Sequence, residues 1–60
     1  TAGDLEKSRE YLTESLELYK QLNQKVDVAD TLLALGNTLR LMGQNDSAQQ
    51  HYQQVEPLMP

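Results

Sequence analysis

The feature that most constrains the fold is a series of leucines at helical spacing, interrupted by one glycine. Leu32, Leu35 and Leu39 follow one another at steps of three and four, and Gly36 comes directly after the second of them. Such steps place side chains on one face of an α-helix. Glycine inside a helix costs roughly 1 kcal/mol relative to alanine. Its presence therefore predicts that the backbone of a neighbouring helix approaches closely at Gly36.

The residues that follow predict this neighbouring helix. Gly43 fits the position just past the end of the leucine helix. Ala48 and Tyr52 are four residues apart and therefore share a helical face. Ala48 is small enough to allow a close approach from its own side, and Tyr52 fills the space around the crossing. Together the two segments predict an antiparallel helix pair.

Apolar spacing along the whole chain predicts an all-α fold with three helices, at about 4–22, 28–42 and 46–56. The middle helix carries two apolar lines, so we expect it to contact neighbours on more than one side. Pro57 is expected to end the third helix, because proline disfavours helical geometry in the residue before it.

Polar residues between the helices predict their ends. Asn23 is expected to stop the first helix in a left-handed conformation. Asp27 is expected to cap the second helix, with Asp30 completing a weak capping box, and Asn45 or Asp46 to cap the third. These assignments imply tight turns between successive helices.

Composition narrows the possible partners. Nine acidic residues against five basic ones give a net charge of −4. This charge opposes binding to nucleic acid or to an acidic membrane surface. The 60 residues include no cysteine, and no apolar run approaches the ~20 residues that span a membrane. With no leader-like segment either, we expect a single small domain over 1–60 in a cytoplasmic protein.

No residue set suggests catalysis, a metal or a cofactor. His51 is the only histidine, and glutamines flank it, so we expect it to lie exposed or at the rim of the fold. The acids of the first helix are expected to be solvated surface. The three glycines are isolated, so they form no phosphate-binding loop. We therefore expect a protein that is not an enzyme and holds no metal and no cofactor.

As a joint pattern, these residues resemble a tetratricopeptide repeat (TPR). Two leucines stand where that family usually has Trp and Tyr, and the other positions match its small, aromatic and closing proline residues. The positions that carry the resemblance are Leu32, Leu35, Gly36, Leu39, Gly43, Ala48, Tyr52 and Pro60. The resemblance implies an α-α superhelix of antiparallel helix pairs.

Aligning Gly3 with Gly43 gives an offset of 40 residues, which is longer than the usual TPR unit of 34. The chain is similar to the longer variety of the family, found in kinesin light chains and in bacterial regulatory and signalling proteins. Residues 4–22 then correspond to the outer helix of a preceding unit, and residues 28–60 to one complete repeat. Stacked repeats generally need at least three units. The resemblance thus implies neighbouring repeats, self-association or a cap that needs its neighbour.

The resemblance also implies a function in protein–protein interaction. TPR proteins usually bind a peptide or helix in the concave groove lined by the inner helices. The corresponding residues are Asp30, Leu33, Asn37, Arg40 and Leu41. Asn37 matches a position that often hydrogen-bonds a partner's backbone; alternatively, it contacts only a local network or water. Leu33 replaces the lysine of TPRs that bind chaperone tails, which argues against a clamp for C-terminal carboxylates.

Two other functions remain open from the sequence. The segment either spaces or self-associates, with its inner face buried against another copy, or it regulates a larger signalling or transcription-regulating protein.

Overall fold

The computed structural model describes residues 2–58, which form three α-helices and a short 3₁₀ helix. The helices are α1 (Ala2–Gln21), α2 (Lys25–Leu41) and α3 (Asn45–Val55), and the 3₁₀ helix η1 (Glu56–Leu58) follows α3 directly. The predicted all-α fold is confirmed. Each helix begins and ends within three residues of its expected bounds. Pro60, which was expected to close the repeat, lies outside the described residues.

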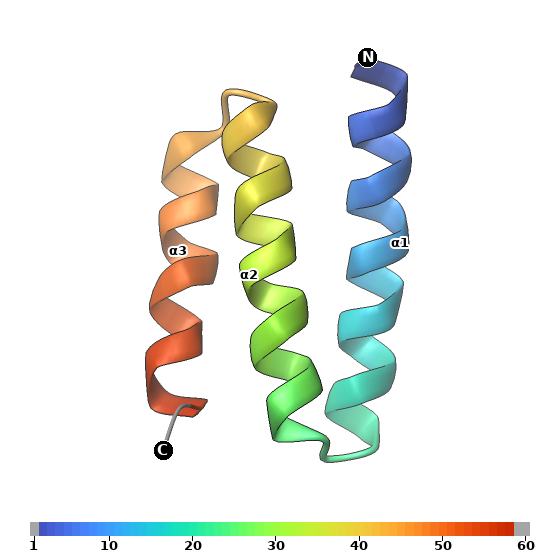
Figure 1. Cartoon of the computed structure of the whole chain (residues 1–60), viewed down its shortest axis with the longest axis vertical. Helices are drawn as coiled ribbons and strands as arrows, with labels where there is room; N and C mark the ends of the chain where they lie inside the picture. Colours follow the sequence, from blue (N-terminus) through green and yellow to red (C-terminus); the bar gives the residue numbers. More distant parts are fainter. Residues whose placement is uncertain (1, 59–60) are drawn as a thin grey trace.

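The three helices lie side by side in one layer, with α2 between α1 and α3 (Figure 1). The Cα atoms extend over 33 × 20 × 11 Å, so the layer is about one helix thick. Within residues 2–58, α1 and α3 each pack on α2 and not on one another. The flanks of α2 are therefore covered, and the layer leaves two broad faces.

The core follows the buried side of α2. Leu32 is its most deeply buried side chain, with 1% of its surface exposed. Leu16 from α1 and Val55 from α3 join the same cluster from the two flanks. The expectation that the middle helix contacts neighbours on more than one side is thus confirmed. The core cluster consists of Leu16, Val28, Ala29, Leu32, Leu35 and Val55.

Two buried threonines on α2 have their hydroxyl groups satisfied within the helix. Thr31 donates to the carbonyl oxygen of Asp27 at 2.7 Å, and Thr38 donates to that of Ala34 at 3.0 Å. A buried hydroxyl without a partner would cost free energy, so these bonds allow threonine at the helix contacts.

The turn from α1 to α2 is closed by two backbone hydrogen bonds. Asn23 donates to the carbonyl oxygen of Lys20 at 3.2 Å, and Gln24 donates to that of Tyr19 at 3.1 Å. Asn23 has φ 57°, the left-handed conformation that such a helix end requires. The predicted stop at Asn23 is therefore confirmed.

The turn from α2 to α3 has the same geometry twenty residues later. Gly43 donates to the carbonyl oxygen of Arg40 at 3.0 Å, and Gln44 donates to that of Leu39 at 2.9 Å. Gly43 has φ 83°, which glycine adopts without the steric cost of a Cβ atom. The predicted role of Gly43 is also confirmed.

The predicted N-caps are wrong. The N-cap residues are Gln24 and Gln44, and neither makes a capping hydrogen bond through its side chain. Asp27 lies inside the first turn of α2, while Asn45 and Asp46 lie inside the first turn of α3. The reason is the compact turn geometry, which leaves a single residue between the left-handed position and the next helix. The two aspartates instead lie where a negative charge favours the helix dipole.

Candidate functional site

The five residues predicted to bind a partner all lie on one exposed side of α2. Successive residues of a helix are rotated by about 100°, so positions three, four and seven apart share a side. Leu33 is 36% exposed and Leu41 is 65% exposed, although both are apolar. We call this side the α2 face, and it consists of Asp30, Leu33, Asn37, Arg40 and Leu41, all exposed.

Asn37 lies at the centre of the α2 face, with the two leucines four residues away on either side. Asp30 and Arg40 contribute one negative and one positive charge near its two ends. Arg40 has no ion pair or side-chain hydrogen bond within residues 2–58. Its guanidinium is therefore available to a carboxylate from outside the chain.

The contact between α2 and α3 is built around Gly36. A Cβ atom added there would lie 2.5 Å from Cε1 and 2.8 Å from Cδ1 of Tyr52. The space at Gly36 is thus filled by the ring of Tyr52, and not by the backbone of the neighbouring helix as we expected. Ala48, the other predicted small residue, is buried with 2% of its surface exposed.

The hydroxyl of Tyr52 extends past Gly36 to the α2 face. It donates a hydrogen bond of 2.6 Å to Oδ1 of Asn37. The local contact that was the alternative for Asn37 is therefore present, and the amide nitrogen of this side chain has no partner within the described residues. The sequence suggested Tyr52 only as a packing residue. The signal for the bond was the adjacency of Gly36 and Asn37. A tyrosine ring that packs against Gly36 can place its hydroxyl beside the next residue, Asn37.

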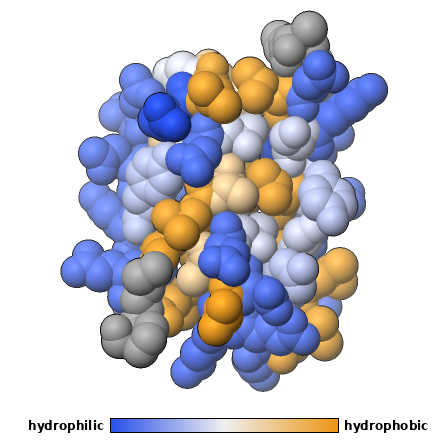
Figure 2. All heavy atoms as spheres, in the orientation of Figure 1, coloured by the Kyte–Doolittle hydropathy of each residue, from blue (hydrophilic) through white to orange (hydrophobic). Residues whose placement is uncertain are grey.

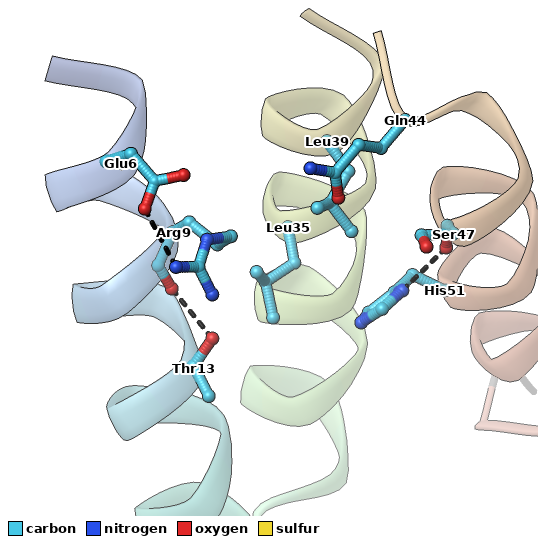
Figure 3. A pocket seen from close by; sticks show the side chains of 8 residues that line it. All are labelled: Glu6, Arg9, Thr13, Leu35, Leu39, Gln44, Ser47 and His51. Carbon is cyan, nitrogen blue, oxygen red and sulfur yellow. Dashed lines mark hydrogen bonds and ion pairs between the residues drawn. The ribbon is translucent and has the colours of Figure 1, made fainter. Parts of the chain in front are cut away.

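The opposite side of α2 forms the floor of a pocket of about 310 Å³ (Figure 3). Leu35 and Leu39 form this floor, and each lies about 200° around the helix from Asn37. Figure 3 shows α1 on the left and α3 on the right, the reverse of Figure 1, so the pocket opens on the other face of the layer. The walls are Glu6, Arg9 and Thr13 from α1, and Gln44, Ser47 and His51 from α3 and the N-cap position before it.

The polar groups around this pocket are largely paired with their own helices. Arg9 donates from Nη2 to Oε2 of Glu6 at 2.9 Å, and this hydrogen bond raises the pKa of the already cationic Arg9 further. Thr13 donates to the carbonyl oxygen of Arg9 at 2.7 Å. His51 is half-buried, and its Nδ1 lies 2.7 Å from the carbonyl oxygen of Ser47.

Sequence reasoning did not find this pocket. Its walls come from two helices that do not touch, and their convergence over α2 depends on how both helices pack. Spacing within a single helix carries no information about that packing. His51 was expected to be exposed or at the rim, and it is a half-buried wall residue. Because Glu6 and Arg9 offset each other in charge, the pocket presents a polar rim over an apolar floor.

Within residues 2–58, no group of three or more histidine, aspartate or glutamate side chains is arranged to hold a metal ion. No helix in this range is sufficiently long and apolar to cross a membrane.

Hydrophobic side chains are also exposed outside the α2 face. Figure 2 shows a largely hydrophilic surface with separate hydrophobic patches. On α1, Tyr11 is 70% exposed and Leu18 is 58% exposed. Leu22 and Val26, in and just after the first turn, are more than half exposed as well. We call these four residues the α1 edge: Tyr11 and Leu18 lie on α1, Leu22 lies in the turn after it, and Val26 lies at the start of α2.

Comparison with known proteins gives one match. A family model described as tetratricopeptide repeat matches residues 1–60, the whole chain. No curated protein and no solved structure matches the chain. The match agrees with the all-α architecture of residues 2–58. The longer variety of the family, as in kinesin light chains, stays a prediction.

Proposed function

Because the chain belongs to the tetratricopeptide repeat family, we propose that it is a protein-binding module that holds a peptide or helix of its partner on the α2 face. Repeats of this family generally mediate protein–protein binding and are generally non-catalytic scaffolds. We assign the contact to the side chains of the α2 face.

The observation that carries the proposal is the exposure of the α2 face at the centre of the layer. α2 has both flanks covered by helices, yet Leu33 and Leu41 remain open to solvent on either side of Asn37. Apolar side chains next to unpaired polar groups are what a partner segment needs for affinity and for orientation. Asp30 and Arg40 add opposite charges along the same line.

The experiment is a binding titration with a defined probe. Peptides of twelve residues are selected from a random display library against the 60-residue chain, and their affinities are measured by calorimetry. Leu33→Glu and Asn37→Ala should each weaken binding at least fivefold, with unchanged helicity. Leu18→Glu is the matched control, because Leu18 is an exposed leucine on α1. If the control weakens binding and the α2 variants do not, the assigned face is wrong.

A second candidate function is structural, and the α1 edge favours it. Tyr11, Leu18 and Leu22 recur at helical spacing on α1 and the turn after it, and each is more than half exposed within residues 2–58. Packing of another helix, from a neighbouring repeat or a second copy, would bury them. Sedimentation equilibrium over a dilution series tests self-association: a dimer that Leu18→Glu dissociates supports it, and a monomer throughout excludes it.

Two broader proposals accompany this function. The segment regulates a larger signalling or transcription-regulating protein, and that protein is cytoplasmic. The net charge of −4 favours a protein partner over nucleic acid or an acidic membrane surface. Locating the full-length gene product in fractionated cells, and identifying its other domains, tests both.

A further inference from the structure

Two contacts of a single side chain connect the packing of α3 to the α2 face. The ring of Tyr52 lies against Gly36, where no Cβ atom would fit. Its hydroxyl donates to Oδ1 of Asn37 at 2.6 Å. The first contact holds the ring in place, and the second lets the ring hold an exposed side chain on another helix.

The hydrogen bond fixes which way the amide of Asn37 faces. An asparagine side chain has one oxygen, which accepts, and one nitrogen, which donates two hydrogen atoms. Since Tyr52 donates to the oxygen, that oxygen is turned toward α3. The amide nitrogen is then on the other side, where it has no partner within residues 2–58. Asn37 therefore presents donors to whatever lies on the α2 face.

We propose that Tyr52 is a positioning residue of the α2 face: it holds the oxygen of Asn37, so that the amide donors of this side chain face a carbonyl oxygen of the partner. This inference rests on the proposed function of that face. The carbonyl groups inside a partner helix already accept bonds from its own backbone, whereas those of an extended segment are free. The donor orientation therefore favours an extended peptide over a helix.

The first test uses the free protein and needs no partner. Relaxation of the side-chain ¹⁵N of Asn37 reports how strongly its amide group is ordered. We expect an ordered amide in the wild type and a mobile one in Tyr52→Phe, which keeps the ring on Gly36 and removes only the hydroxyl. Asn45 is the matched control, because it is exposed and its amide should not change. Equal order of Asn37 in the two proteins overturns the positioning role.

The second test is a double-mutant cycle on a library peptide whose binding Leu33→Glu abolishes. Tyr52→Phe should weaken binding about threefold to tenfold, the range of one hydrogen bond, and should have no further effect in an Asn37→Ala background. Asn37→Asp, which replaces the donors by an acceptor, should weaken binding more than Asn37→Ala. Additive effects of the two substitutions, or full affinity in Asn37→Asp, overturn the inference.

The outcomes separate this inference from the function on which it rests. If no peptide is sensitive to Leu33→Glu, the α2 face is not the binding site, and the proposed function and the donor role both fail. If such a peptide binds as a helix, as peptide NMR shifts would reveal, the proposed function stands and the extended partner is wrong. If it binds extended but Tyr52→Phe has no effect, only the positioning role fails.

Discussion

A Cβ atom on Gly36 would lie 2.5 Å from Cε1 of Tyr52, a separation that real Cβ atoms do not show. Glycine at position 36 therefore leaves the space that the ring of Tyr52 fills, and the contact between α2 and α3 depends on both residues. An isolated helix would favour alanine at this position. In the folded chain, glycine is favoured at this position because it makes room for the ring.

Gly36→Ala is accordingly expected to destabilise the protein. Overpacking a well-packed contact costs about 1–3 kcal/mol, and the better helix propensity of alanine returns about 1 kcal/mol, so we expect a net loss of stability of up to about 2 kcal/mol. Urea unfolding followed by circular dichroism measures it. In a Tyr52→Ala background, Gly36→Ala should instead stabilise the protein, because no ring then occupies the space beside position 36. A stabilising Gly36→Ala in the wild type would contradict the packing described here.

Gly43 should tolerate asparagine better than alanine. No atom lies within 4 Å of a Cβ at Gly43, so the cost arises from its φ of 83° alone. A left-handed conformation costs an ordinary residue roughly 1–2 kcal/mol, and asparagine less. Asn23 already occupies the equivalent position in the first turn. Thermal unfolding of Gly43→Ala and Gly43→Asn checks the order, and equal melting temperatures would contradict it.

Leu32→Ala should remove a large part of the free energy of unfolding. Truncating a buried leucine to alanine lowers the free energy of unfolding by about 2–5 kcal/mol. The total free energy of unfolding of a 60-residue domain is roughly 3–9 kcal/mol. Leu41→Ala is the matched control on the same helix, since Leu41 is 65% exposed and Leu32 only 1%. The free energy of unfolding of the control should stay within about 0.5 kcal/mol of the wild-type value. Near-equal urea midpoints would show that the core lies elsewhere.

His51 is expected to carry its proton on Nδ1 when neutral. The carbonyl oxygen of Ser47 only accepts, so the ring nitrogen 2.7 Å from it must donate. Two-dimensional ¹H–¹⁵N spectra of the imidazole distinguish the two tautomers directly. Ser47→Ala keeps this carbonyl and should leave the tautomer unchanged. A proton found on Nε2 at neutral pH would mean that the bond to Ser47 is absent in solution.

Local sequence signals predicted the helices and the way they end. Leucine spacing placed α2, and the tolerance of Asn23 and Gly43 for positive φ placed both turns. These features depend on single residues or on one helix, where spacing is informative. The N-caps were wrong because the compact turns begin each helix immediately, which overrides the preference of Asp27 for a cap position.

The candidate site was predictable only in part. Helical spacing placed Asn37 and Arg40 on a common side without any knowledge of α3. Nothing in that spacing indicated that Tyr52 would cross the glycine and bond to Asn37, since the bond joins residues fifteen positions apart. The pocket was missed for the same reason, because Arg9 and His51 line one pocket only through the packing of two helices on a third.

The absence of contact between α1 and α3 within residues 2–58 has a kinetic consequence. Every helix packs against its immediate neighbour in the chain, so no long loop must close before stabilising contacts form. Helical proteins with such local contacts fold in microseconds to milliseconds. Opening is local for the same reason: α3 can separate from α2 while the α1–α2 hairpin persists. Each opening of α3 would release Tyr52 from Asn37 before the rest of the chain unfolds, and amide hydrogen exchange in α3 reports how often this happens.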